Sequence, residues 1–528
     1  MTVLCAFDII NNGGGFAMNK TRKKILISIS VLILTYFFIC ISLYFFEPIY
    51  YNAPDLSMAS YAFDLYDKFN KDNDSQFYIK QITHTDIAVA EDDLRLKYVD
   101  DTILVVFNDD IKYSDAATLF DKYDAEICGY IDILDFYQIA VKSDSYEDLT
   151  NKCLLIHDDE LVKCAMVDYF EETPVSETTT DNAEIYNYFN PLYYEILGID
   201  KINELINIEE ISKNIKVGVF DVLVNYENPQ LNVANESDYN AEILNSPLID
   251  GAASHGTHVA GIIAAKNDYV NCVKGIVPGA AVYSDNATNS SVSYWIASIA
   301  DMIVNQNIKA INISMGYNSY IPVSASLGDE GAISFIEEEN LFFECILSKI
   351  IDNGYEFLLC LAAGNEADTS LYRVNSPYFA YGDKKLLSKL DIFNIFDSEP
   401  EYCDSAYSLC FNMIDNDEVR DRIMIVTACD SDKEISDYAS SGSGIDIVAP
   451  GDNVYSTGYY SKYELMSGTS MATPFVTGTA ALLFELNNEF TGKQVKDILI
   501  DASDEELSDS FFSYPLLNAY KAVKYALN

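Results

Sequence analysis

The sequence predicts an α/β fold in which a parallel sheet is flanked by helices, preceded by a small α+β unit and an N-terminal transmembrane helix. From about residue 190 to the end, apolar runs of strand length alternate with helical patterns, as in parallel sheets covered by helices. A shorter stretch before it has the order β-α-β-β-α-β, and an uncharged apolar run precedes both. We therefore expect an anchor, a small domain and a larger α/β domain.

The uncharged run covers residues 25–46. As a helix it would extend about 33 Å at roughly 1.5 Å per residue, enough to cross a bilayer core of about 30 Å. Basic residues precede it and none follows until Lys68, so residues 1–24 should be cytoplasmic and everything after the span extracellular. The alternative is a cleaved secretory signal, which would make the protein secreted, but such signals usually have a shorter apolar core. Residues 47–98 resemble a polar, acidic stalk.

The small unit, predicted over residues 99–172, contains four strand-like runs and two helical patterns. The strands are expected at 102–107, 126–133, 136–141 and 164–170, and the helices at about 114–123 and 146–156. This is the element order of a ferredoxin-like unit. Residues 173–192 follow as an exposed linker, rich at its start in Thr, Ser and Glu.

The larger domain, predicted over residues 193–528, carries its strands as continuous apolar runs. The strands are expected at 217–220, 310–313, 357–362 and 423–428, and the helices at 256–265, 294–305, 341–352 and 470–487. Asp221 ends one strand and Asn365 follows another, so both should lie at the carboxyl edge of the sheet, where such folds build their sites. Gly261 and Gly478 predict closely packed helices, and Pro474 is expected in a first helical turn.

Charge and cysteine content exclude several classes of function. The chain has 82 acidic and 33 basic residues, a formal net charge of −49 that disfavours nucleic acid as a partner. We interpret the acidity as a solvated exterior; a site for basic substrates is the alternative. The eleven cysteines contain no Cys-x-x-Cys, so no zinc site is expected. No cofactor or metal ligand is predicted, and acidic clusters are too common here to assign a structural calcium site.

Individual cysteines and one histidine are predicted to be structural. Cys360 and Cys429 lie in apolar runs and are expected to be buried free thiols, whereas Cys403 and Cys410 are a candidate pair in a loop. His258 is expected to pack within its helix rather than to bind metal.

Three segments carry the chemistry of a candidate active site. Residues 468–474, Gly-Thr-Ser-Met-Ala-Thr-Pro, place Ser470 at a helix start, where free N–H groups and the helix dipole favour a developing negative charge. Residues 254–261 contain His255, and residues 217–221 end at Asp221. A hydroxyl is a weak nucleophile unless a base and an orienting carboxylate assist it, and these segments offer all three groups.

On these motifs, residues 193–528 resemble the catalytic domain of the subtilisin-like serine proteases, in which Asp, His and Ser occur in this order. The resemblance implies a triad of Asp221, His255 and Ser470 and a polypeptide substrate. Asn365, in the segment 361–366, matches the family's oxyanion asparagine. The remaining implied site residues line the substrate: Ser314, Met315, Gly316, Ala363 and Gly364.

The segment after Asp221 departs from the family pattern. The family usually continues with a small hydroxyl residue and then glycine, whereas this chain has Val222 and Leu223. We expect a lost local hydrogen bond and less space around the carboxylate. A catalytically impaired subtilase fold used for binding is therefore the alternative function. An α/β-hydrolase esterase is disfavoured because residues 468–472 lack the second glycine of a nucleophile elbow.

The end of the small unit, residues 166–172, is similar to the tail of subtilase propeptides, which assist folding and inhibit the enzyme. The resemblance implies that residues 99–172 are the protein's own propeptide and a partner of the catalytic domain; an ordinary accessory domain is the alternative. The complete prediction is a membrane-anchored extracellular serine endopeptidase made as a zymogen.

Overall fold

The computed structural model describes residues 77–171, 178–179, 186–234, 252–314, 330–365 and 411–528, except 81, 83, 91–95, 110, 223, 268–272, 288–289, 412–413, 441, 443, 460–462 and 510–511. The predicted span at 25–46, the stalk up to residue 76, Met315, Gly316 and the candidate pair Cys403 and Cys410 lie outside these residues. Among the residues that are described, no helix is long and apolar enough to cross a bilayer.

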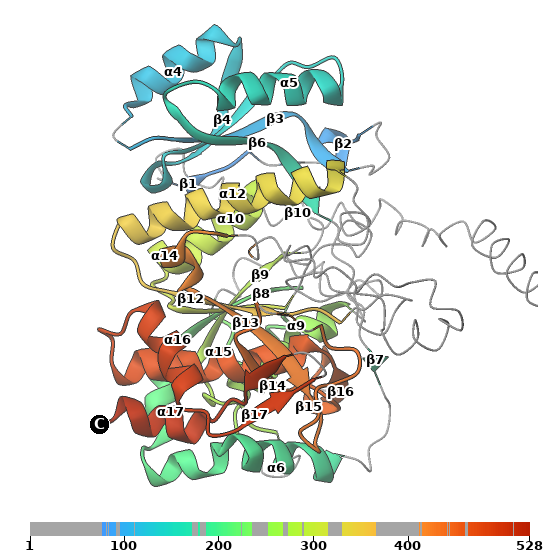
Figure 1. Cartoon of the computed structure of the whole chain (residues 1–528), viewed down its shortest axis with the longest axis vertical. Helices are drawn as coiled ribbons and strands as arrows, with labels where there is room; N and C mark the ends of the chain where they lie inside the picture. The colour runs from blue at the N-terminus through green and yellow to red at the C-terminus, as the bar shows by residue number, and fades with distance from the viewer. Residues whose placement is uncertain are drawn as a thin grey trace, which may run out of the picture. The chain divides into compact units, whose positions relative to one another are not determined.

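Residues 77–171 form an antiparallel sheet with two helices, which we call the N-terminal unit (Figure 1). Its elements are β1 (Phe77–Tyr78), η2 (His84–Asp86), β2 (Ile87–Val89), β3 (Lys97–Phe107), α4 (Tyr113–Lys122), β4 (Ala125–Ile131), η3 (Asp132–Leu134), β5 (Phe136–Val141), α5 (Tyr146–His157) and β6 (Val162–Glu171). The strand order is β1-β4-β5-β3-β6, and β2 pairs with β3. Strand β3 lies between β5 and β6, so the last strand of the unit returns beside the third.

The predicted boundaries need two corrections. Residues 77–98, predicted as stalk, contribute β1, β2 and the start of β3 to the sheet. The predicted linker, 173–192, contains β7 (Thr178–Thr179) and the beginning of α6 (Tyr186–Leu197). Strands of two or three residues carry no readable period, so only their pairing with longer strands reveals them.

The C-terminal domain is built on a parallel sheet of six strands. These are β8 (Lys216–Asp221), β9 (Ala281–Asn286), β11 (Ala310–Ile313), β12 (Leu358–Ala362), β13 (Ile423–Cys429) and β14 (Ile447–Pro450), in the order β14-β13-β12-β11-β8-β9. Every strand is parallel to its neighbours. The predicted strand at 310–313 matches β11, and β9 and β14 were not predicted.

Helices cover both faces of this sheet, so the domain has three layers. Besides α6, the long helices are α9 (Ala252–Ala264), α10 (Val292–Ala300), α12 (Glu330–Asp352), α15 (Thr469–Leu486), α16 (Gly492–Asp501) and α17 (Ala519–Ala526). Leu358 and Cys360 of β12 lie in one core cluster with α9, α15, α16 and α17, whereas Leu359 and Leu361 lie in a second with α10 and α12. Successive side chains of a strand point to opposite faces of the sheet, so each face of β12 packs against its own set of helices. This arrangement confirms the predicted α/β fold.

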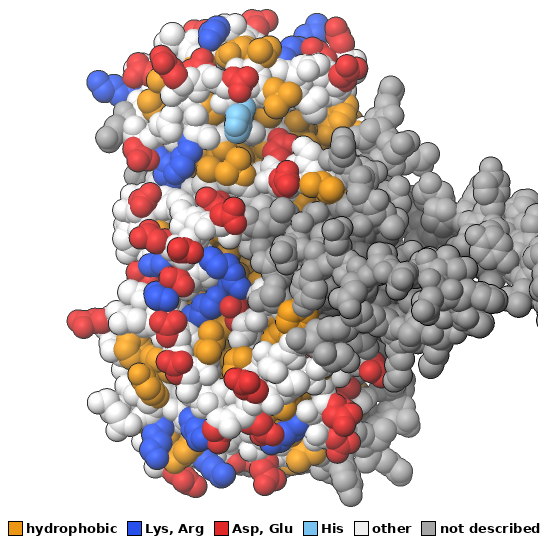
Figure 2. All heavy atoms as spheres, viewed as in Figure 1, with side chains coloured by type: hydrophobic (Ala, Val, Ile, Leu, Met, Phe, Trp, Pro, Cys, Tyr) orange, Lys and Arg blue, Asp and Glu red, His pale blue; other side chains and the backbone are white. Residues whose placement is uncertain are grey.

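The remaining short elements connect these layers. They are η4 (Ile199–Glu204), α7 (Ile208–Ile211), η5 (Ser212–Asn214), β10 (Ser290–Ser291), the π-helical turn η7 (Asp301–Asn305), α14 (Asp417–Arg420), β15 (Val454–Thr457), β16 (Tyr463–Ser467), β17 (Glu506–Ser508) and β18 (Ser513–Pro515). Cys360 and Cys429 are buried free thiols, as predicted. Figure 2 shows acidic side chains spread over the visible face of the described residues, with basic ones among them.

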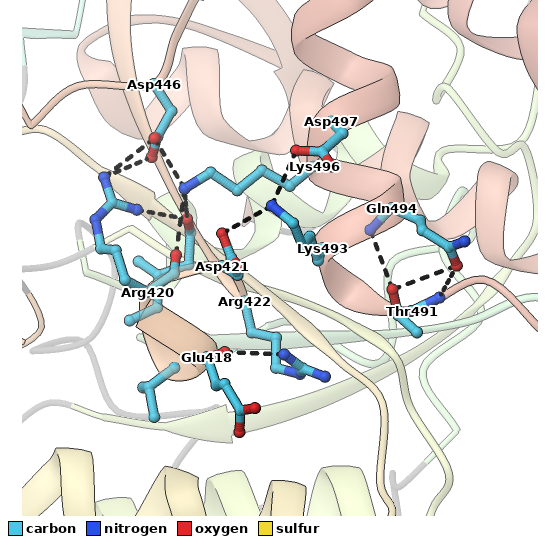
Figure 3. Close-up of polar contacts among 12 residues, drawn as sticks. Glu418, Arg420, Asp421, Arg422, Asp446, Thr491, Lys493, Gln494, Lys496 and Asp497 are labelled. Atoms are coloured by element: carbon cyan, nitrogen blue, oxygen red, sulfur yellow. Dashed lines mark hydrogen bonds and ion pairs between the residues drawn. The ribbon is translucent and has the colours of Figure 1, made fainter. Parts of the chain in front are cut away.

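A buried ion network fastens α16 to the sheet (Figure 3). Lys496 of α16 is 7% exposed and lies 2.8 Å from Asp446, just before β14. Arg420 of α14 donates to both carboxylate oxygens of Asp446 at 3.0 Å. Burial lowers the pKa of Lys496, and the carboxylate opposes this effect. Removing Asp446 would leave two cations without their anion, so we regard the network as structural.

The close approach of α9 to β15 depends on Gly261, and we predict that Gly261→Ala destabilises the fold. An added Cβ would lie 2.1 Å from the Thr457 hydroxyl and 2.3 Å from the Ser456 hydroxyl. These hydroxyls cannot move freely because they donate to the carbonyls of Thr257 and His258. Overpacking of this kind costs about 1–3 kcal/mol, which denaturant unfolding measures. Gly261→Ala should lower the free energy of unfolding less when Ser456→Ala and Thr457→Ala are already present, because the two hydroxyls are then absent. An equal loss in wild type and in this double variant would contradict the steric explanation.

Candidate active site

Three neighbouring strands bring predicted site residues to one edge of the sheet. Asp221 is the last residue of β8, Ser314 directly follows β11, and Asn365 lies three residues after β12. Because β8, β11 and β12 are adjacent and parallel, these residues share the carboxyl edge, as predicted. Gly364 has φ +100°, a conformation that favours glycine and turns the chain towards Asn365.

Asp221 and His255 form a buried pair. The Asp221 Oδ1 atom lies 2.6 Å from His255 Nδ1, and the residues are 1% and 3% exposed. An ionised carboxylate only accepts hydrogen bonds, so Nδ1 carries the hydrogen and Nε2 is the basic nitrogen of the ring. This is the protonation state that a histidine needs to accept a proton from a hydroxyl.

Val222 contributes one local hydrogen bond to the carboxylate through its main chain. The Val222 backbone N–H donates to Asp221 Oδ1 at 2.7 Å. The carboxylate therefore keeps a local hydrogen bond that any residue except proline at this position can supply. The bond that a hydroxyl side chain at this position would add is one that valine cannot make, and Leu223 lies outside the described residues.

Ser470 is the second residue of α15 and is 6% exposed. Asn365 is held beside it by Thr469, whose N–H and hydroxyl donate to Asn365 Oδ1 at 2.8 and 3.0 Å. The same hydroxyl accepts from the Gly364 N–H at 3.0 Å. With its oxygen engaged, Asn365 has its amide nitrogen left as a donor. The sequence prediction missed this role of Thr469, although the residue stands in the serine motif.

The helix α9 is tied to the strand that leads into the serine motif. His258 is fully buried, and its Nε2 lies 3.0 Å from the Val454 carbonyl oxygen and 3.1 Å from that of Glu464 in β16. Ser254 donates to the Glu464 carboxylate. These contacts hold the turn that carries His255 against β16, which ends three residues before Ser470. His258 is thus a packed helix residue, as predicted.

The burial of His258 leads to a prediction about pH. Desolvation, with a smaller contribution from His255, lowers the pKa of His258 to about 3. The unfolded chain, with a pKa near 6.5, then binds a proton that the folded chain does not. The contribution of His258 to the free energy of unfolding should be fully present above about pH 6.5. It should decline by up to roughly 1.4 kcal/mol per pH unit as the pH falls towards 3.

Denaturant titrations between pH 7 and 4 measure this effect as the difference between wild type and His258→Gln. The same change at the partly exposed His157 serves as control. A parallel pH dependence in wild type and His258→Gln would contradict the assignment.

No group of three or more His, Cys, Asp or Glu within the described residues is arranged to hold a metal ion. Of the predicted substrate-lining residues, the structure brings Ser314, Ala363 and Gly364 to the same edge as Asp221. The Ser314 hydroxyl donates to the Ser470 carbonyl oxygen at 3.2 Å.

A buried Asp–His pair and a serine at a helix start, on the carboxyl edge of a parallel α/β sheet, define a serine hydrolase. Comparison with known proteins identifies the family: the profile described as "Subtilase family" matches residues 212–514. The chain belongs to this family and is a subtilisin-like serine endopeptidase.

Two curated relatives illustrate the similarity. Subtilisin E from Bacillus subtilis (strain 168) is 28% identical over 357 residues, which cover 67% of this chain and 74% of that protein. Subtilisin Savinase from Lederbergia lenta is 27% identical over 313 residues, covering 59% of this chain and 91% of the relative.

Two solved structures share the fold. The epidermin leader peptide processing serine protease from Staphylococcus aureus has a TM-score of 0.52 and 15% identity, covering 81% of this chain and 98% of that one. Fervidolysin from Fervidobacterium pennivorans, a keratinolytic enzyme, also has a TM-score of 0.52 and is 18% identical. The match covers 85% of this chain and 63% of fervidolysin.

Proposed function

We propose that this endopeptidase cleaves polypeptides with Ser470 as nucleophile, His255 as general base and acid, and Asp221 as the orienting carboxylate. His255 Nε2 takes the Ser470 proton as the hydroxyl attacks the scissile carbonyl, and then returns it to the leaving amine. Water hydrolyses the acyl-enzyme by the same route. The observation that carries the proposal is the buried 2.6 Å contact between Asp221 and His255 Nδ1, which places the imidazole hydrogen on Nδ1 and makes Nε2 the basic nitrogen.

A serine-reactive fluorophosphonate tests this proposal directly. Full-length protein incubated with the probe should be labelled at Ser470, as located by peptide mass spectrometry. Labelling elsewhere, or none in protein that hydrolyses peptides, would contradict the role of Ser470. This reagent also separates an active protease from an impaired binding protein.

Asn365 and the Ser470 backbone N–H would bind the oxyanion, and we predict that Asn365→Leu impairs the chemical step. Because the amide donates mainly to the charge of the transition state, kcat should fall roughly a hundred to a thousand-fold, with little change in KM. Steady-state kinetics on a peptide substrate measure both constants. A raised KM with unchanged kcat would refute the oxyanion role.

We further propose that the N-terminal unit is a ferredoxin-like propeptide that inhibits the site. The unit packs on α10 and α12 (Figure 1), and β6 pairs with β10 of the C-terminal domain. The buried Asp168 of β6 accepts from the N–H and hydroxyl of Ser293, at 3.0 and 2.7 Å, near the start of α10. Lys349 of α12 reaches Asp109 and Asp135 of the unit at 2.5 and 2.6 Å. These contacts support an inhibitor that remains docked.

The linker would be the first substrate. Glu171 pairs with Ser290 at one end, and Thr178 pairs with Ser467 at the other, three residues before Ser470. We therefore narrow the cut to the chain between them, residues 172–177. Wild type should be cut there at a rate independent of dilution, and N-terminal sequencing locates the cut. An active wild type that is never cut would show that the propeptide proposal is wrong.

Membrane anchoring through residues 25–46, with the catalytic domain extracellular, remains part of the proposal. Its support is the uncharged run and the basic residues that precede it. Protease added to intact cells should reach the segment after residue 46. Protection until lysis would contradict this topology, and a mature N-terminus beyond residue 46 on secreted protein would indicate a cleaved signal.

A further inference from the structure

The carbonyl group of Ser470 has an unusual partner. In an α-helix this oxygen accepts from the N–H four residues later, which here is Pro474 and has no N–H. Pro474 is the sixth residue of α15, so the prediction of a first-turn position, where the missing N–H has little effect, was wrong. Instead, the hydroxyl of Ser314, just after β11, donates to the Ser470 oxygen at 3.2 Å.

The Ser314 hydroxyl is itself held by a buried amide. Asn312 of β11 donates from Nδ2 to Ser314 Oγ at 2.8 Å, and the Thr477 hydroxyl donates to Asn312 Oδ1 at 3.1 Å. Asn312 and Thr477 are fully buried. Three side chains thus connect the third turn of α15 to the carbonyl at its start by way of the central strand β11.

We infer that Asn312 is a positioning residue for the nucleophile. Asn312 acts through Ser314, whose hydroxyl holds the Ser470 carbonyl oxygen. The position of this carbonyl in turn fixes the Ser470 N–H and hydroxyl relative to the edge of the sheet, where Asp221 and Asn365 lie. The inference rests on the proposed function of Ser470. An amide suits the task because it accepts from the helix and donates to the strand end at the same time.

The test compares two buried threonines of α15. The Thr479 hydroxyl donates to the Phe475 carbonyl at 2.8 Å, whereas the single hydrogen of the Thr477 hydroxyl is shared between the Thr473 carbonyl and Asn312 Oδ1, both at 3.1 Å. Thr477→Val and Asn312→Ala should lower kcat about ten to a hundredfold while KM changes less than about threefold, and Thr479→Val should leave kcat nearly unchanged. Melting temperatures above the assay temperature establish that each variant is folded.

Labelling by the fluorophosphonate separates failure of this inference from failure of the proposed function. Wild type unlabelled at Ser470 would refute the function itself. Ser470 labelled at the same rate in wild type, Thr477→Val and Thr479→Val, with equal kcat, would overturn the role of Asn312. Since valine matches threonine in volume, the Thr477→Val result stands even where Asn312→Ala does not fold.

Discussion

Ser470→Ala should abolish peptide hydrolysis, lowering kcat by on the order of a million-fold, because no other group can form the acyl-enzyme. The fold should persist, since the serine side chain is small and lies at the start of α15. The linker in residues 172–177 should also remain uncut. Hydrolysis of a peptide substrate, followed with protein free of other proteases, measures the effect.

Ser513→Ala is the matched control, because this serine lies in the β17–β18 hairpin, where it bonds Ser508. It should hydrolyse peptides and cut its own linker like wild type. A loss of less than about tenfold in Ser470→Ala would mean that Ser470 is not the nucleophile.

Asp221→Asn should lower kcat by about ten thousand-fold while the fold stays intact. Asp221 Oδ1 now accepts from both His255 Nδ1 and the Val222 N–H. An asparagine carries no charge to stabilise the imidazolium in either orientation, and one that turned its NH₂ group towards His255 would donate to Nδ1 and lose the bond from the Val222 N–H. The imidazole would then carry its hydrogen on Nε2 and could not take the proton of Ser470.

Asp200→Asn provides the same chemical change at an exposed ion pair with Lys274 and should leave kcat unchanged. Pre-steady-state kinetics should show that acylation, not product release, is slowed in Asp221→Asn. If both variants kept wild-type kcat, Asp221 would not be the orienting carboxylate.

The strands and helices best predicted from the sequence are those whose pattern is local. Strand β11 was predicted with its observed bounds because a central parallel strand is buried on both faces and reads as a continuous apolar run. Helix α12 begins at Glu330, eleven residues before the predicted start, because acidic residues interrupt its apolar pattern. One of them, Glu339, is fully buried, which composition alone would not indicate.

The short strands show the opposite case. Strands β1, β2, β7 and β10 have two or three residues each. Segments of this length have no propensity or period that separates them from loops. They form because a longer strand already offers free backbone groups, so their existence depends on the rest of the fold.

The sequence by itself determined which chemical groups the site contains: a serine at a helix start, a histidine, a carboxylate at a strand end and an amide. These follow from residue type and local structure. Only the tertiary structure decided how the groups are held. Asp221 meets His255 across 34 positions and Thr469 holds Asn365 across 104. The Ser314 hydroxyl donates across 156 positions to the Ser470 carbonyl oxygen, which Pro474 cannot bond. Hydrogen bonds between such distant residues have no local signal, because their donors and acceptors meet only when the sheet and α15 pack together.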